Sequence, residues 1–495
     1  MTYGEGIDAA LFRAGDDWPD RVAFSCLGES LTYAELLTRA KALAACLQKE
    51  GVAKGDRVGI AMTKGLDMPV AVYGIWLAGA AFVPLDTASP VSRHAGIVRD
   101  CDIVCVVGAD RNAEMLRELA ETTGVVIIGT LIDGLKCRTP SLDAVDYYPV
   151  ANILDDTAYI IFTSGSTGAP KGITHTHGSG RAFAEAWSEH YALTRDDVFF
   201  CTVPLHFDLS FADFFTPPTV GARTELVPEA IQLFPASLAS ALEETGATIW
   251  STVPFLITQL IERGTPEQHD FSCLRWLIYA GEQMPPAKLP GIRAAFDAKI
   301  SNSYGPTEVN QVTQYTVPLD HRADCAIPIG HALGKADLVL SDHGEMLCSG
   351  PMTMIGYWNR PELNEHAFVQ LDGKRYYRTG DLAEQRQDGL WMFHGRADRQ
   401  VKVRGNRIEL DEIEAVLAAH PAVSEAAVVT TSGRSSLTAY VTLAPGQYVD
   451  AGMLRFHCAE VLPPYAVPSG FNVMGKFART GTGKIDRRAL VEEAS

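Results

Sequence analysis

The stretch YIIFTSGSTGAPKG, residues 159–172, joins a short apolar run to a polar loop. Its first four residues are aromatic or β-branched and lack a helical period, which predicts a buried strand. The hydroxyls, glycines and lysine that follow supply donors, a flexible backbone and a cation, which are the groups that bind a chain of phosphates. The stretch is not a Walker A loop, because Lys171 follows Pro170 and precedes Gly172. Taken alone, it leaves a polar surface loop as the alternative.

Length, charge and cysteine content indicate a cytoplasmic protein of two or more domains. A chain of 495 residues exceeds the size of one hydrophobic core. The net charge of −18 argues against nucleic acid as the main partner. The 10 cysteines form no CxxC pair and no zinc spacing, which predicts free thiols in a reducing compartment. The N-terminus lacks a signal peptide, and the longest apolar stretch, residues 71–85, predicts a core helix followed by a strand and no membrane span.

Apolar runs alternate with amphipathic helical patterns along the first two thirds of the chain, which predicts an α/β protein with parallel sheets. Strands are expected within residues 22–27, 57–62, 103–109, 124–129, 158–163, 247–253 and 274–281, and a helix within 31–50. A glycine-dense, β-rich segment follows from about residue 327 to 398. After it the pattern changes to strand, turn, strand, helix and strand, and we expect a domain boundary near Asp398.

Further motifs decide between a phosphate-binding loop and a polar surface loop at residues 159–172. They are spread over nearly the whole chain, in the same order as in one known group of enzymes. The chain resembles the adenylate-forming superfamily of acyl-CoA synthetases, luciferases and nonribosomal-peptide adenylation domains. Besides residues 159–172, the resemblance rests on LTYAEL (31–36), LAGAAFVPLDTASP (77–90), HFDLS (206–210), NSYGPTE (302–308), GYW (356–358), YRTGDLA (377–383), GRADRQVKVRGNRIE (395–409), LPPYAVP (462–468) and RTGTGKIDRRAL (479–490). Each motif alone is weak evidence, but together they are specific.

The resemblance implies a fold and two domains. We expect an α/β protein with a large N-terminal domain, residues 1–397, made of two helix-covered sheets and a β-rich subdomain. Residues 398–495 would form a small, mobile α+β domain. Asp398 matches the hinge position of the family, and hinges absorb backbone changes at a few residues. The family resemblance also suggests a monomer.

The first reaction of the superfamily joins a carboxylate to the α-phosphate of ATP and releases pyrophosphate, with Mg²⁺ neutralising charge. By resemblance, Tyr304 stacks on the adenine, and Asp381 and Arg396 bind the ribose. Thr307 contacts a phosphate or the metal, and Glu308 is the Mg²⁺ ligand. The β- and γ-phosphates are bound by the loop residues Thr163, Ser164, Gly165, Ser166, Thr167 and Gly168, with Lys171 assisting.

Lys484 is the residue expected to carry the catalysis, together with Glu308 and Thr163. A lone C-terminal lysine is usually a solvated charge, but the surrounding TGTGK motif matches the lysine that contacts the substrate carboxylate and the α-phosphate. A second reaction then transfers the acyl group to a thiol after the small domain rotates. Gly405 would line the tunnel for a phosphopantetheine arm, because a residue without a side chain permits close approach; a simple turn is the alternative.

Asp208, in HFDLS, indicates which acid is activated. In amino-acid-activating members an aspartate here pairs with the substrate ammonium, and a buried carboxylate needs such a partner; a helix-capping role is the alternative. Ala212 replaces a large aromatic common at its position. The lining has no second carboxylate and no cation besides Lys484, which favours a small or medium, uncharged substrate. The expected substrate-binding residues are Phe207, Asp208, Leu209, Ala212, Thr252, Ile278, Ala280, Ser303, Gln311 and Val312, of which Thr252, Ser303 and Gln311 could hydrogen-bond a polar substituent.

The chain shows no carrier-protein motif after the lysine motif, so we expect a separate, phosphopantetheinylated carrier protein as the acceptor of the amino acid. The predicted enzyme is therefore an amino acid–carrier protein ligase that uses ATP and Mg²⁺ in nonribosomal peptide or polyketide biosynthesis. Two alternatives stay open: an acyl- or aryl-CoA ligase, which Asp208 disfavours, and a nucleotide-binding module without chemistry, which the presence of Glu308, Asp381 and Lys484 disfavours.

Overall fold

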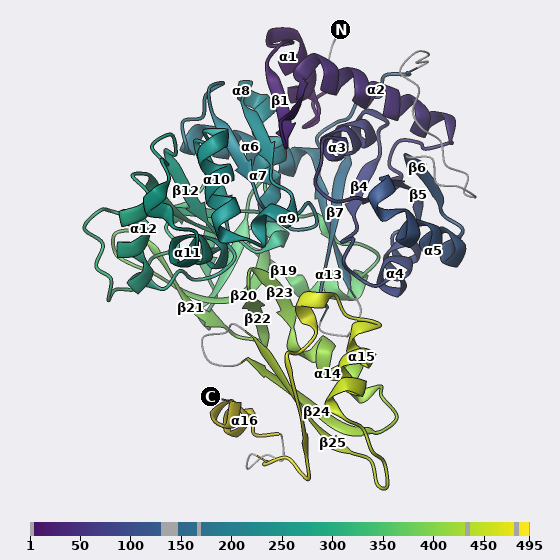
Figure 1. Ribbon diagram of the computed structural model, residues 1–495, viewed down its shortest axis with the longest axis vertical. Coiled ribbons are helices and arrows are strands. Elements are labelled where there is room, and N and C mark those ends of the chain that lie inside the picture. Colours follow the sequence, from purple (N-terminus) through teal and green to yellow (C-terminus); the bar gives the residue numbers. More distant parts are fainter. Residues whose placement is uncertain (1–3, 130–146, 166–169, 431–435, 480–484, 495) are drawn as a thin grey trace.

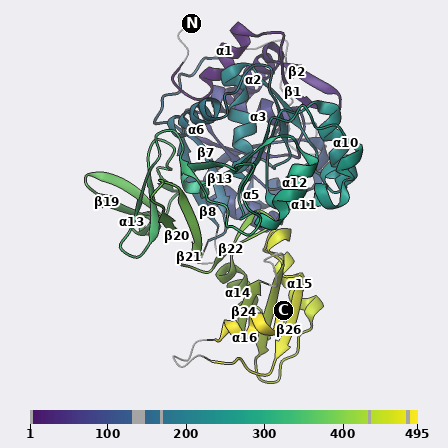
Figure 2. The ribbon, with the colours of Figure 1, turned by 90° about the vertical axis from the view of Figure 1, so that its left-hand side faces the viewer.

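A computed structural model describes residues 4–129, 147–165, 170–430, 436–479 and 485–494. A large domain occupies one end of the long axis and a small C-terminal domain the other (Figure 1). A β-rich subdomain projects from the side of the large domain beside the small one (Figure 2). The expected α/β class and the division into a large and a smaller part are confirmed.

Two mixed sheets form the large domain in the described part of the chain. The first has the order β15 (His331–Ala332), β14 (Thr313–Thr316), β13 (Lys299–Tyr304), β12 (Trp276–Tyr279), β11 (Ile249–Thr252), β9 (Val198–Cys201), β10 (Arg223–Leu226), β1 (Val22–Cys26) and β2 (Glu29–Thr32). The second has the order β18 (Gly356–Tyr357), β8 (Lys171–Thr176), β7 (Thr157–Thr163), β4 (Ala81–Pro84), β3 (Arg57–Ala61), β5 (Ile103–Gly108) and β6 (Val126–Gly129). Their central strands pair in parallel, as the alternating sequence pattern predicts.

Helices cover and separate these sheets. They are α1 (Ala9–Asp17), α2 (Tyr33–Lys49), α3 (Asp67–Leu77), α4 (Val91–Asp100), α5 (Ala113–Thr123), α6 (His177–His190), α7 (Phe211–Phe215), α8 (Pro217–Val220), α9 (Glu229–Gln232), α10 (Pro235–Thr245), α11 (Pro254–Arg263) and α12 (Leu289–Ala295). The helix expected within residues 31–50 begins at Tyr33, because Thr32 ends β2 and caps the helix through a reciprocal pair with Glu35. The expected helix and strand within residues 71–85 are α3 and β4.

The β-rich subdomain and the small domain follow in sequence. The former holds β16 (Asp337–Leu340), β17 (Glu345–Ser349), α13 (Pro361–Ala367), β19 (Phe368–Leu371), β20 (Lys374–Gln385) and β21 (Trp391–Arg396). The latter holds the hairpin of β22 (Gln400–Val403) and β23 (Asn406–Glu409), then α14 (Leu410–Ala418), β24 (Val423–Thr430), β25 (Leu437–Leu443), α15 (Ala451–Ala459), β26 (Gly470–Met474) and α16 (Arg487–Ala494). This order matches the expected strand, turn, strand, helix and strand. The boundary near Asp398 stays a prediction.

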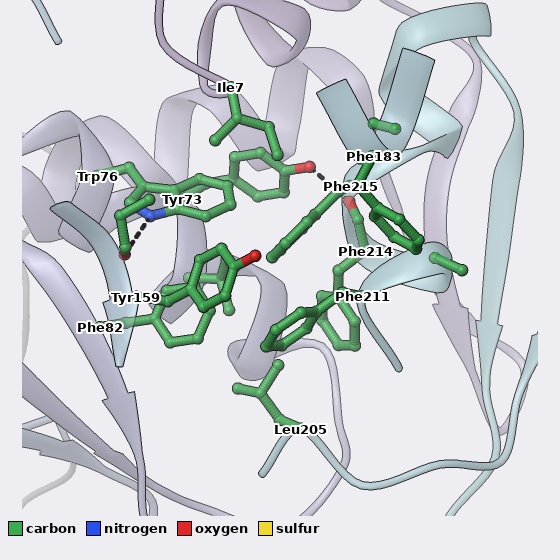
Figure 3. Packing of buried hydrophobic residues seen from close by; sticks show 14 of the residues in the cluster. Ile7, Tyr73, Trp76, Phe82, Tyr159, Phe183, Leu205, Phe211, Phe214 and Phe215 are labelled. Carbon is green, nitrogen blue, oxygen red and sulfur yellow. Dashed lines mark hydrogen bonds between the residues drawn. The ribbon is translucent and has the colours of Figure 1, made fainter. Parts of the chain in front are cut away.

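An aromatic core fixes the two segments that reach the site (Figure 3). Tyr159, on β7, packs edge-on against Phe211 of α7 with ring centroids 4.7 Å apart, and Phe211 stacks on Phe215 at the same distance. Strand β7 leads into the glycine- and serine-rich loop, and α7 follows Asp208. The core therefore holds the end of β7 and the segment that follows Asp208 in one rigid frame, because close-packed rings leave little freedom.

Free thiols were expected, and every cysteine in the described residues is a free thiol. No helix in the described ranges is long and apolar enough to cross a membrane.

Candidate active site

The loop predicted to bind phosphates joins two antiparallel strands, with Thr163 of β7 paired to Lys171 of β8. The Thr163 Oγ1 atom is buried and has no hydrogen-bond partner in the described part of the chain. Ser164 Oγ accepts the N–H of Glu409 at 3.2 Å and donates to the carbonyl of Arg407 at 3.1 Å, so the loop contacts the small domain. The predicted loop residues Ser166, Thr167 and Gly168 lie outside the described residues.

Glu308 lies at the centre of a buried cluster of charges, on a short 3₁₀ turn (Thr307–Val309) after β13. Its side chain has no exposed surface. Oε1 accepts the hydroxyl of Tyr357 at 2.8 Å and lies 3.6 Å from Lys171 Nζ, while Oε2 accepts Arg407 Nη1 at 2.5 Å. Burial opposes ionisation, yet Arg407 and Lys171 hold the pKa of Glu308 well below its usual range. The carboxylate is thus ionised and compensated by cations.

The turn before Glu308 depends on Gly305. A Cβ atom there would lie 1.6 Å from the carbonyl oxygen of Asn310, so no other residue fits this approach. The same turn places Thr307 on the wall of a cavity between the two domains.

Asp381, within β20, hydrogen-bonds both Arg396, expected with it at the ribose, and Tyr304, expected at the adenine. Its Oδ2 accepts the hydroxyl of Tyr304 at 2.5 Å, and its Oδ1 accepts Arg396 Nη1 at 2.5 Å. Arg396 also donates two bonds of 2.6 Å to the carboxylate of Asp398, the expected hinge residue. Asp381 and Arg396 line the interdomain cavity, and Tyr304 lies directly behind Asp381.

Asp208 is the first residue of the 3₁₀ turn Asp208–Ser210, and the N-cap position of that turn is occupied by Phe207. It lies on the cavity wall, where burial raises its pKa. The cavity therefore contains a carboxylate that a cation would stabilise. This geometry disfavours the helix-capping alternative.

The predicted substrate-binding residues separate into a wall and a layer behind it. Phe207, Asp208, Leu209, Ala280 and Gln311 line the cavity. Ser303 lies behind Gln311 and donates to its Oε1 at 2.5 Å, and Thr252 accepts the hydroxyl of Thr202 at 3.0 Å. Ala212, Ile278 and Val312 are buried and do not belong to the described lining.

Several cavity residues were missed by the sequence analysis. Phe183 and Asn310 come from the large domain, and Gln400, Lys402 and Arg407 come from the β22–β23 hairpin. The cavity joins the predicted amino acid pocket to the predicted nucleotide residues, and three cations, Arg396, Lys402 and Arg407, line it. Gln400, Lys402 and Arg407 belong to the motif GRADRQVKVRGNRIE, which was the one sequence signal that could have indicated them. No local pattern in this motif indicates that the hairpin folds over the cavity.

Gly405 lies at a close contact between the two domains. Its φ is +82°, and a Cβ atom there would lie 2.5 Å from Val253 Cγ1. Its N–H donates to Glu282 Oε1 at 2.6 Å. Gly405 lines the cavity, and both its conformation and its surroundings require glycine.

Lys484 lies outside the described residues. On either side of it, Arg479 and Ile485 form an isolated antiparallel bridge, and Arg479 pairs with Glu425 of β24. Helix α16, which follows, lies in the part of the small domain away from the large one (Figures 1 and 2). None of the described residues flanking Lys484 lines the cavity.

Comparison with known proteins now decides the family. The model of the AMP-binding enzyme family matches residues 11–358, and that of the AMP-binding enzyme C-terminal domain matches residues 412–484. The chain belongs to the AMP-binding enzymes. Because the two matches follow each other along the chain, this AMP-binding enzyme carries both parts of the family's architecture.

The relatives of this AMP-binding enzyme include two of similar length. The L-proline--[L-prolyl-carrier protein] ligase of Pseudomonas fluorescens is 33% identical over 96% of this chain and 97% of the relative. The ligase of the same name from Streptomyces coelicolor is 33% identical over 93% and 92%. The dimodular nonribosomal peptide synthase of Bacillus subtilis is 32% identical over 95% of this chain, which spans only 20% of that protein.

Solved structures share the fold of the whole chain. The amide bond synthetase McbA from Marinactinospora thermotolerans has a TM-score of 0.88 at 24% identity, covering 99% of each chain. The Vibrio cholerae adenylation domain AlmE, in complex with glycyl-adenosine-5'-phosphate, has a TM-score of 0.87 at 24% identity, covering 100% of this chain and 98% of the other.

Proposed function

We propose that this AMP-binding enzyme is a ligase that activates a small to medium, uncharged amino acid as its aminoacyl-AMP and transfers it to the phosphopantetheine thiol of a separate carrier protein. The observation that carries the proposal is Asp208, a carboxylate on the cavity wall whose pKa burial raises. Such a group is stabilised by a cation, and an amino acid brings one in its ammonium. The names of the two relatives of similar length, both amino acid–carrier protein ligases, support the same conclusion.

In the first reaction, the substrate carboxylate attacks the α-phosphorus of ATP and pyrophosphate leaves. We assign the β- and γ-phosphates to the loop residues 163–168, where the unpaired hydroxyl of Thr163 is available to donate. Lys171 lies beside the same cluster, and Thr307 lines the cavity. Asp381 and Arg396 are assigned to the ribose, with Tyr304 against the adenine. These groups position two anions for an in-line displacement.

Glu308 is the residue assigned to Mg²⁺. It presents a buried, ionised carboxylate, and hard oxygen ligands of this kind suit the ion. No group of three or more His, Cys, Asp or Glu side chains in the described residues forms a metal site, so the phosphates and water would complete the coordination. When bound, Mg²⁺ supplies neutralising charge between the phosphates and the attacking carboxylate.

The two reactions require two placements of the small domain. In the arrangement described, the β22–β23 hairpin closes the cavity and the segment flanking Lys484 lies elsewhere. We assign this arrangement to thioester formation, with Gly405 beside the pantetheine arm, and propose that rotation about Asp398 brings Lys484 to the α-phosphate for adenylation.

The proposal is tested by ATP–pyrophosphate exchange over a panel of common amino acids of both chiralities, β-amino acids, and fatty and aryl acids. Exchange with a few amino acids is expected, reduced more than about 100-fold in both Asp208→Ala and Lys484→Ala. Asp342→Ala, an exposed carboxylate in the β-rich subdomain, serves as the control and should leave exchange unchanged. Exchange restricted to fatty or aryl acids and indifferent to Asp208→Ala would replace the proposal with an acyl- or aryl-CoA ligase.

A further inference from the structure

The side chain of Gln311 is held by three donors behind the cavity wall. Its Oε1 accepts Trp187 Nε1 at 2.9 Å, Ser303 Oγ at 2.5 Å and Gln314 Nε2 at 3.2 Å. An indole N–H can only donate, so the Gln311 atom that faces Trp187 must be the carbonyl oxygen and not the amide nitrogen. Trp187 therefore determines the orientation of the Gln311 amide.

From Tyr191 through Gln314 and Ser303 to Gln311, each side chain donates a hydrogen bond to the next. Tyr191 donates its hydroxyl to Gln314 Oε1 at 2.5 Å, and Gln314 Nε2 donates to Ser303 Oγ at 2.7 Å. The single hydroxyl hydrogen of Ser303 is used on Gln311. Ser303 thus has no hydrogen left for a substrate, although the sequence made it a candidate. Buried networks of this kind, with their donors and acceptors satisfied, hold side chains rigidly.

The amide NH₂ of Gln311 is the end of this network. It has no hydrogen-bond partner in the described ranges of the chain, and Gln311 lines the cavity with Asp208, Leu209 and Ala280. Thr252 and Ser303, the other two polar candidates, do not belong to the described lining. Among the predicted substrate-binding residues on the described cavity wall, Gln311 therefore supplies the one oriented donor, beside the carboxylate of Asp208 and the apolar Phe207, Leu209 and Ala280.

We infer that Trp187 is a positioning residue that turns the Gln311 NH₂ toward the substrate side chain, so that the enzyme selects an amino acid carrying a hydrogen-bond acceptor in that side chain. The inference rests on the proposed amino acid activation. An apolar side chain of the same shape would bury the NH₂ without a partner, which disfavours it on the order of 10- to 100-fold. A substrate side chain that carries an ammonium would also be disfavoured, because its N–H groups and the Gln311 NH₂ are all donors.

Isosteric substrate pairs test the inference in ATP–pyrophosphate exchange. The pairs are leucine with 2-amino-4-oxopentanoate, which replaces the branch by a ketone, and valine with threonine. The native enzyme is expected to prefer the oxygen-bearing member of at least one pair by about 10-fold or more in kcat/KM, and its best substrate over a full amino acid panel should carry an acceptor.

Trp187→Phe removes the indole donor but keeps an aromatic ring, and it should reduce this preference at least about 5-fold by weakening activation of the acceptor-bearing member alone. Gln311→Met should abolish or invert the preference, and it covers the case in which Trp187→Phe does not fold. Trp250→Phe is the matched control, since Trp250 is fully buried and its Nε1 donates to Thr202 at 3.2 Å and not to Gln311. If the role of Trp187 were purely structural, Trp187→Phe would lower kcat/KM equally for both substrates of a pair.

The outcomes separate the inference from the proposed function. Activation of alanine, proline or leucine as the best substrate, or a preference that neither Trp187→Phe nor Gln311→Met changes, would overturn the inference and leave amino acid activation intact. Exchange with no amino acid at all, in an enzyme that exchanges with fatty or aryl acids, would overturn both.

Discussion

Glu308 and Arg407 lie 99 residues apart in the chain, yet Arg407 Nη1 approaches Glu308 Oε2 to 2.5 Å in a buried ion pair. Glu308 belongs to the large domain and is the carboxylate assigned to Mg²⁺, whereas Arg407 belongs to the hairpin of the small domain. Removing one partner of such a buried pair costs about 3–5 kcal/mol. The pair therefore couples the charge state of the nucleotide site to the placement of the small domain.

Arg407→Gln should strengthen Mg²⁺ binding several-fold in the presence of a non-hydrolysable ATP analogue, because the competing guanidinium is gone. Calorimetric titration of the metal measures this directly. Arg404→Gln, an exposed arginine on the same hairpin, is the control and should behave as the native protein. An unchanged or weaker Mg²⁺ affinity in Arg407→Gln would contradict the assignment of Glu308 as a carboxylate for which Arg407 and Mg²⁺ compete.

Gly405→Ala should impair thioester formation at least about 10-fold while leaving pyrophosphate exchange within about 3-fold. The added Cβ would meet Val253 Cγ1 at 2.5 Å, in a backbone conformation with φ of +82°. Gly446→Ala is a matched control, because Gly446 has φ of +75° but nothing within 4 Å of its Cβ position. Single-turnover transfer to a phosphopantetheinylated carrier protein separates the two steps. Recovery in the Gly405→Ala/Val253→Ala double variant would identify the steric contact as the cause.

Lys402→Met and Lys484→Met should have opposite effects on the two reactions. Lys402 lines the cavity in the arrangement described, where Asp208 and Asp381 are nearby charges and burial lowers the pKa of the lysine. Loss of Lys402 is expected to slow thioester formation more than about 10-fold with little effect on exchange, and loss of Lys484 to do the reverse. Lys476→Met, at an exposed position of the small domain, controls for removal of a positive charge. If Lys402→Met slowed exchange and thioester formation equally, the result would argue against separate placements of the small domain in the two reactions.

The stability of the large domain should decrease as the pH falls from about 6.5 to 4. Burial lowers the pKa of His175 from 6.5 to about 4, while its ring nitrogens contact the carbonyl of Thr307 at 2.8 Å and Ser179 Oγ at 3.0 Å. The unfolded chain then binds a proton in this range that the folded chain does not, so the folded state loses on the order of 3 kcal/mol relative to it.

Chemical denaturation at several pH values measures this loss. His175→Gln should reduce the slope between about pH 6.5 and 4 without abolishing it, because His177 contributes in the same range, whereas the exposed His343→Gln should leave the slope as in the native protein. The same slope in His175→Gln and the native protein would assign the effect to other groups, of which His177, with its pKa also lowered by burial to about 4, is the first to examine.

Local patterns in the sequence were sufficient for the elements and for the motifs of the site. The apolar run at residues 159–162 predicts β7, and the change of pattern near Asp398 predicts the order of the small domain. These elements were predictable because strand and helix periodicity are properties of neighbouring residues. The roles expected of Asp208 and Glu308 came from the resemblance of HFDLS and NSYGPTE to the motifs of the family.

The contacts between side chains that are distant in the sequence could be seen only in the folded chain. Arg407 reaches Glu308, Lys402 enters the cavity, and Trp187 orients the amide of Gln311 from a separate helix. The first and last of these contacts join residues 99 and 124 positions apart, and no periodic pattern extends that far. The order of residue types sets the chemistry available to this enzyme. Close packing of the two domains and of the core sets which donor faces which acceptor, because hydrogen bonds and ion pairs depend on distances of a few ångströms that exist only in the folded chain.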